Sequence, residues 1–184
     1  MLFRSYNSAL LLNTMGDGLT ASWNNFNIRY YTSEGNECPQ RCGWNNNPSS
    51  AFRFQIETYW YGNYAALSNA NDVLTAIRKN NVVITSPAFT KALEAAAVTM
   101  QGLVFHEIAT NYDQGFIVTE ATDLSTPEKV AALQFSTRAQ MRDAAIAKLG
   151  EAITLWGAVT ATLPKEWRSE EHTSELQSPC NLVC

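Results

Sequence analysis

The feature that most constrains the fold is a long apolar segment over residues 86–120. Its pattern predicts a helix that begins near residue 86 and ends at an Asp-Gln-Gly turn, followed by an extended strip to residue 120. Its apolar residues recur at helical spacing: Phe89, Leu93, Ala97, Met100, Val104 and Ile108. Others widen the stripe beyond one face: Leu103, Phe105 and Tyr112. Ser86 and Pro87 are typical residues for a helix start. A helix that is apolar around most of its circumference packs on several sides, so we expect the central helix of a bundle or helical array.

A second helix is predicted over residues 50–79, where one stripe has steps of three and four residues or their sums. Its members are Phe52, Ile56, Tyr59, Asn63, Leu67, Ala70, Leu74 and Ile77. Asn63 is the polar exception, and we expect it to bond a carbonyl of the neighbouring helix, because a polar group in a core stripe needs a partner. The short connection to residue 86 predicts that the two helices are antiparallel.

The chain after residue 120 predicts a short helix that starts at Thr126 and Pro127, and then a longer one. Thr137 and Gln140 have the spacing of a capping box, with Phe135 as a candidate hydrophobic staple. The longer helix has one apolar face, made of Met141, Ala145, Leu149, Ala152 and Trp156. Its charged residues lie mostly on the other face: Arg138, Arg142, Asp143, Lys148 and Glu151. We therefore predict an all-α fold of tetratricopeptide-like antiparallel helical hairpins, with a long aromatic- and Asn-rich loop over residues 19–49.

The composition is that of a globular chain. It has 184 residues, of which 46% are hydrophobic and 16% charged, with a formal net charge of −4. This length gives room for one domain with a real core. Mild acidity argues against a nucleic-acid partner, which requires clustered Lys and Arg.

Both ends of the sequence look unlike the rest. Residues 168–184 lack apolar periodicity, and RSEEHTSELQS is similar to the translation of a common sequencing adapter. Residues 2–5, LFRS, match the translation of the opposite adapter. We therefore expect residues 1–5 and 168–184 to be adapter artefacts, and residues 6–167 to be an internal part of a longer protein. On this reading His172, Cys180 and Cys184 carry no function.

The loop over residues 19–49 contains the candidate ligand-binding residues. Aromatic side chains stand among several asparagines there, and four of them are our candidates: Trp23, Tyr30, Tyr31 and Trp44. Flat aromatic faces beside amides suit the apolar faces and hydroxyl edges of sugar rings. The alternative is that these aromatics pack beneath the loop as a small satellite core.

Two cysteines in the same loop suggest a disulfide. Cys38 and Cys42 would form a small closed loop if the protein is exported, and would be free thiols if it is cytosolic. A zinc site would need two further ligands, and no suitable cluster follows nearby.

No catalytic signature stands out. His106 and Glu107 begin the helical zinc-protease motif, but position 110 is Thr where that motif needs a second His. Glu107, Asp113 and Glu120 are scattered, and we find no nucleophile–base set, phosphate loop or dinucleotide fingerprint. We therefore predict neither an enzyme nor a metal or cofactor site, with His106 as an ordinary helix residue.

Three segments together resemble a known family. They are ALSNANDVLTAIRKN, ALEAAAVTMQGLVFHEIATNYDQGFIVTE and FSTRAQMRDAAIAKLGEAI. In order and spacing they resemble the N-terminal helical part of SusD/RagB-like proteins. The likeness rests on a helix with an Ala70-Asn71 pair, on a long helix with a turn around Gly115 and a strip to Glu120, and on a third Ala/Leu-rich helix over residues 136–153. The turn is longer than the usual Tyr-Gly.

This resemblance implies a surface lipoprotein of the Gram-negative outer membrane, with its lipid-bearing Cys upstream of these residues. Such a protein binds glycans or other nutrients without cleaving them, and it covers a TonB-dependent (SusC-like) transporter. The alternative is an intracellular tetratricopeptide-like adaptor that holds peptides in helical grooves.

Overall fold

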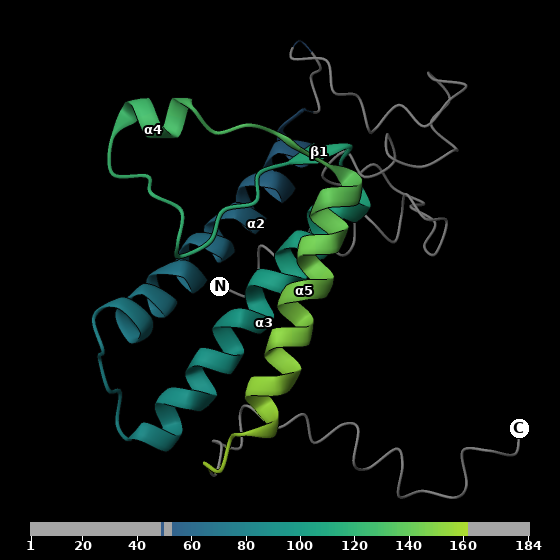
Figure 1. Cartoon of the computed structure of the whole chain (residues 1–184). Coiled ribbons are helices and arrows are strands. Elements are labelled where there is room, and N and C mark those ends of the chain that lie inside the picture. Colours follow the sequence, from purple (N-terminus) through teal and green to yellow (C-terminus); the bar gives the residue numbers. More distant parts are fainter. Residues whose placement is uncertain (1–48, 50–52, 162–184) are drawn as a thin grey trace, which may run out of the picture. The chain divides into compact units, whose positions relative to one another are not determined.

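The structure is a computed structural model that describes residue 49 and residues 53–161. The chain divides into two compact units, Met1–Ala66 and Leu67–Cys184. The described part is mostly helical, which confirms the all-α prediction. Its elements in chain order are α2 (Arg53–Leu74), the π-helix η2 (Thr75–Lys79), α3 (Pro87–Asn111), β1 (Gln114–Gly115), α4 (Pro127–Ala131), β2 (Ser136–Thr137) and α5 (Arg138–Gly157) (Figure 1).

Helix α3 starts and ends where the sequence predicts. The Ser86 hydroxyl accepts a hydrogen bond from the Phe89 amide at 3.2 Å, and Pro87 is the first helical residue. This satisfies one of the amides that a helix start leaves without a partner. At the other end Tyr112 is extended, so the chain leaves the helix as a strip.

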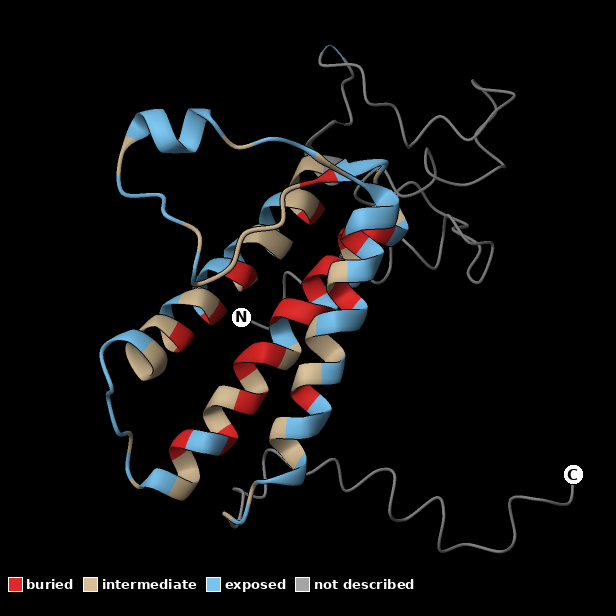
Figure 2. Cartoon of the chain, in the orientation of Figure 1, coloured by how far each residue is buried: buried red, intermediate tan, exposed pale blue. Residues whose placement is uncertain are grey.

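The core of the second unit lies where the end of α2 meets α3 and α5. One buried cluster joins these three helices: Ala70 and Leu74 from α2, Ala97 and Val98 from α3, and Ala152 from α5. Figure 2 shows the buried residues of α3 as a nearly continuous band. Three of the five members of this cluster are alanines, so small side chains form much of this core.

Both helix pairs are antiparallel. Asn71 of α2 bonds Gln101, and Arg78, seven residues later, bonds Glu94, which lies earlier in α3. In the same way Trp156 Nε1, near the end of α5, donates to Thr99 Oγ1 at 3.0 Å. The start of α5 lies beside the end of α3, since Gln114 pairs with Thr137 in an antiparallel two-stranded sheet. The predicted antiparallel arrangement of the first two helices is therefore confirmed for the part of α2 in this unit.

Helices α3 and α5 lie close together at Gly102. A Cβ placed on this glycine would lie 2.8 Å from the Cδ2 and Cγ atoms of Leu149. This distance is well inside van der Waals contact, so a side chain here would force Leu149 to move.

Helix α3 packs against both α5 and the end of α2, as expected of a central helix, but not every residue of its predicted apolar stripe is buried. Met100 and Leu103, which the pattern placed in its apolar stripe, have exposed fractions of 42% and 45%. The buried side of α3 carries Gly102 and the polar Gln101 instead. The apolar pattern could not select the buried side, because apolar residues occur on every side of this helix.

Asn63 also differs from its prediction. Its Nδ2 donates to the Tyr59 carbonyl of its own helix at 3.0 Å, rather than to a neighbouring helix. A local bond to the carbonyl four residues earlier satisfies the amide without a tertiary partner.

The capping predictions after residue 120 are confirmed. Thr126 caps α4, and Thr137 and Gln140 form the complete capping box of α5. Phe135 lies 57% exposed and stacks on Phe116 with ring centroids 4.2 Å apart. The aromatic pair thus joins the two chain segments that flank α4.

Lys148 and Glu151 do not lie with the solvent-facing charges of α5. Both are partly buried, and Lys148 Nζ donates to Glu151 Oε2 at 3.0 Å. Arg138, Arg142 and Asp143 are exposed, as predicted. The two inner charges belong to the site described next.

Candidate functional site: a polar cluster around Arg78

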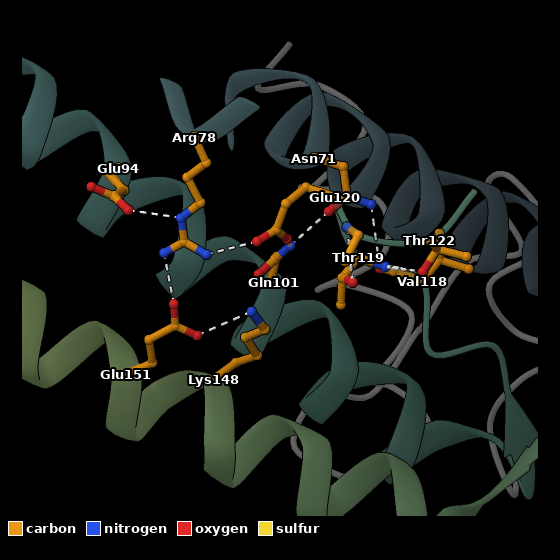
Figure 3. A network of polar contacts seen from close by, with 11 residues as sticks. Asn71, Arg78, Glu94, Gln101, Val118, Thr119, Glu120, Thr122, Lys148 and Glu151 are labelled. Atoms are coloured by element: carbon orange, nitrogen blue, oxygen red, sulfur yellow. Dashed lines mark hydrogen bonds and ion pairs between the residues drawn. The ribbon is translucent and has the colours of Figure 1, made fainter. Parts of the chain in front are cut away.

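Arg78 binds three carboxylates that come from three different parts of the chain (Figure 3). Its Nε donates to Glu94 Oε1 of α3 at 2.7 Å. Its Nη1 donates to Glu120 Oε1 at 2.6 Å, and its Nη2 donates to Glu151 Oε1 of α5 at 2.6 Å. We call these four residues, together with Lys148, the Arg78 cluster. A planar guanidinium with several donors is the side chain that can hold three carboxylates at once.

Arg78 belongs to η2, a single π-helical turn that continues α2. A π-turn changes the direction in which the following side chains leave the helix, and such turns often occur at functional sites. The connection to α3 then contains two residues with positive φ, Asn81 (51°) and Thr85 (60°). Asn tolerates this left-handed conformation, whereas a β-branched Thr adopts it with strain.

Amide side chains extend the cluster inward. Gln101 Nε2 donates both to Glu120 Oε2 at 2.8 Å and to Asn71 Oδ1 at 2.7 Å. Asn71 Nδ2 in turn donates to the Val118 carbonyl at 3.3 Å. Gln101 is fully buried, and within the described residues its Oε1 atom has no hydrogen-bond partner. The polar contacts therefore run from Arg78 into the interior, where they are strengthened by low solvent exposure.

The cluster fastens the strip that follows β1, which we call the strap (residues 116–120). Asn71 holds its backbone at Val118, and Arg78 and Gln101 hold its last side chain, Glu120. The Glu120 side chain is only 10% exposed. The strap is thus attached to the helices by polar contacts from α2, η2 and α3.

Beyond the strap the chain makes an exposed excursion (residues 121–135) that carries α4. No residue of α4 is buried, and Figure 1 shows this short helix standing away from α3 and α5. The excursion returns at the β1–β2 pair, where Arg138 donates to the Tyr112 carbonyl at 3.2 Å and to Asp113 Oδ1 at 2.8 Å. The Arg78 cluster and this β-pair are therefore the attachments at its two ends.

The charges of the cluster are mutually stabilised. Burial raises the pKa of Glu120, but hydrogen bonds from Gln101, from its own backbone amide and from Arg78 outweigh this effect and lower that pKa overall. The pKa of Glu151 is likewise lowered, because bonds from Arg78 and Lys148 outweigh burial. For Arg78, burial alone lowers the pKa, yet hydrogen bonds to Glu94, Glu151 and Glu120 raise it above its usual range. The guanidinium and these two carboxylates are therefore all ionised at neutral pH.

This chemistry is suited to holding elements together rather than to proton transfer. Glu120 and Glu151 have pKa values below the ordinary range, so they are poor proton donors at neutral pH. Arg78 does not release its proton in this range. No set of three or more His, Cys, Asp or Glu side chains in the described part of the chain could hold a metal ion.

The residues that the sequence nominated for ligand binding lie outside the described residues: Trp23, Tyr30, Tyr31 and Trp44. The same is true of Cys38 and Cys42, and of the presumed adapter segments 1–5 and 168–184. These assignments and the domain boundaries stay predictions. His106 is described and is exposed on α3.

Sequence reasoning missed the Arg78 cluster, since its members are far apart along the chain. Glu120 was predicted to be too scattered from Glu107 and Asp113 to form an acid/base pair with them; in the structure it lies between Arg78 and Gln101. The available signal was the resemblance itself, because Asn71 and Glu120 are both among the residues of its motifs.

Comparisons with known proteins leave the resemblance untested. No family model matches the chain, and no curated protein or solved structure is significantly similar to it. Across the residues that the structure describes, none of the helices has the length and apolar character to cross a membrane.

Proposed function

We propose that this chain is part of a surface-exposed, non-catalytic component of a TonB-dependent outer-membrane uptake system, and that it binds glycans or other nutrients. The observation that carries the proposal is the attachment of the strap. Asn71 and Glu120, which belong to the SusD/RagB-like motifs, both bond the buried Gln101. A resemblance in helix composition alone gives no reason for these two residues to meet.

The helical architecture also supports this proposal. Helix α3 forms one antiparallel pair with the end of α2 and another with α5. The strap and the excursion connect α3 to α5 along the chain. We propose that these helix pairs are tetratricopeptide-like hairpins, as the resemblance implies. In this family such helices support the scaffold and face the transporter, while aromatic-rich loops meet the ligand.

The proposed ligand-binding region is the aromatic loop with Trp23, Tyr30, Tyr31 and Trp44. It is chosen by residue type, since stacked aromatics and amides recognise sugar rings. A glycan array with the full chain tests it, using Trp23→Ala and Trp44→Ala. Tyr61→Ala is the matched control, because Tyr61 is an aromatic on α2 with 65% of its surface exposed.

We expect both tryptophan variants to lose glycan binding and the Tyr61 variant to retain it. Unchanged binding in both tryptophan variants would remove the loop from the proposal. The partner and location are tested separately by the upstream gene sequence and by co-purification with a TonB-dependent transporter. An export signal followed by an acylated Cys supports the surface location.

One observation favours the alternative function, an intracellular adaptor. Ile146 and Ile153 lie two turns apart on one side of α5, with exposed fractions of 63% and 73%. Exposed apolar residues at this spacing suit a helical peptide partner. A complete gene that starts without any export signal would favour the adaptor over the uptake component.

A further inference from the structure

We infer that Arg78 and Gln101 form a carboxylate-binding site, which Glu120 of the same chain fills in this structure. Its ligand class is a small monocarboxylate, and such a ligand takes the site when the Glu120 side chain is removed. This inference does not depend on the proposed uptake function.

The geometry is that of a two-point carboxylate site. One oxygen of Glu120 accepts from Arg78 Nη1 at 2.6 Å, and the other accepts from Gln101 Nε2 at 2.8 Å. The two donors come from different elements, η2 and α3, so together they define the orientation of the carboxylate plane. Hydrogen bonds in which the donor or the acceptor is ionised are stronger than neutral ones, and two donors on two oxygens add geometric selectivity.

The donors are held in place without Glu120. Arg78 is also bonded to Glu94 and Glu151, which fix its guanidinium from the sides of α3 and α5. Gln101 is also bonded to Asn71 and is fully buried. Loss of the Glu120 side chain therefore leaves two preorganised donors that point at the same small space, which favours binding of a ligand there.

The local charge selects a monoanion. Without Glu120, the positive charges of Arg78 and Lys148 equal the negative charges of Glu94 and Glu151. A bound monocarboxylate restores the single excess negative charge of the native cluster. A dianion such as sulfate would add a second one close to Glu94 and Glu151, which costs free energy at low solvent exposure.

The test is chemical rescue of Glu120→Ala in the full chain by sodium acetate, compared with sodium chloride at equal ionic strength. Thermal unfolding measures stability, and amide hydrogen exchange measures protection of residues 116–120. We expect acetate to stabilise Glu120→Ala beyond chloride and to restore protection of the strap. At ten times its dissociation constant, acetate raises the ratio of folded to unfolded protein about tenfold.

Two matched variants separate specific binding from a general effect of acetate. In Arg78→Met/Glu120→Ala one donor is absent, and in Glu120→Gln a neutral amide still occupies the site. We expect acetate and chloride to act equally on both of them. Equal effects of the two salts on Glu120→Ala, or an equal acetate effect in all three variants, would overturn the inference.

A variant that is unfolded without salt also gives an answer. If Glu120→Ala lacks helical circular dichroism in chloride, we expect acetate to restore the signal in a saturable manner. If acetate restores nothing while Glu120→Gln is folded, then Arg78 and Gln101 do not hold a carboxylate as a separable ligand, and the inference is wrong.

Discussion

Replacing Arg78 by Met tests whether the cluster holds the helices and the strap together. Methionine retains most of the length and the apolar stem of arginine but cannot bond the carboxylates of Glu94, Glu120 and Glu151. These three side chains are 20%, 10% and 36% exposed, so their ion pairs with Arg78 contribute different amounts to the free energy of unfolding. An exposed ion pair contributes about 0–1 kcal/mol, whereas stranding a buried charge costs about 3–5 kcal/mol.

The loss of unfolding free energy that we expect for Arg78→Met lies between these limits. The pair with Glu120 is close to buried and contributes most, and the pair with Glu151 contributes least because Lys148 also binds that carboxylate. Discounting all three for solvent, we expect Arg78→Met to lower the free energy of unfolding by about 3 kcal/mol. For a folded region of this size that corresponds to a fall in Tm of roughly 10 °C.

The assay is thermal and urea unfolding of the full chain, followed by circular dichroism at neutral pH. Arg142→Met is the matched control, since Arg142 forms an exposed ion pair with its neighbour Asp143. We expect this surface substitution to change stability by about 0.5 kcal/mol or less. If the two variants lower Tm equally, the reasoning about the Arg78 cluster is refuted.

Three further predictions follow from the same structure. The pKa values of Glu120 and Glu151 are lowered in the folded state, so their stabilising contribution is present above the ordinary glutamate pKa, about 4.3, and is lost as pH falls below it. In urea unfolding between pH 7 and pH 3, the free energy of unfolding should fall more steeply with decreasing pH in the natural chain than in Arg78→Met. Parallel curves would contradict this. Gly102→Ala should destabilise by about 1–2 kcal/mol because its Cβ meets Leu149, whereas Gly150→Ala has open space and should stabilise by up to about 1 kcal/mol; calorimetry that ranks the two in the opposite order would be inconsistent with the α3–α5 contact. Thr137→Ala should cost about 1 kcal/mol because it removes the capping box of α5, while an unchanged Tm would show that the cap contributes nothing.

The sequence was sufficient for features that depend on neighbours along the chain. The start of α3 at Ser86 and Pro87, and the capping box at Thr137 and Gln140, follow from bonds within a few residues, so local pattern reading locates them. The buried face of α5 with Met141, Ala145 and Ala152 is also correct, since these residues recur at helical spacing.

The candidate site could not be predicted from the sequence in this way. Arg78 and its three carboxylates are separated by 16, 42 and 73 residues, and each is an ordinary surface residue type. Only the antiparallel packing of α2, α3 and α5 brings them together. Lys148 and Glu151 were wrongly predicted to face solvent. Helical spacing gives the angle between residues on one helix, but it does not say which other helix lies beside them.

By itself, then, the amino-acid sequence determined that the described part of the chain is helical and where α3 and α5 begin. The tertiary structure decided which side of α3 is buried, why Gly102 rather than Met100 faces a neighbour, and how Asn71 and Glu120 meet at Gln101. The physical reason is the range of the interactions. Capping and periodicity act over a few residues, whereas close packing and shared carboxylates require segments that are distant in the chain to be adjacent in space.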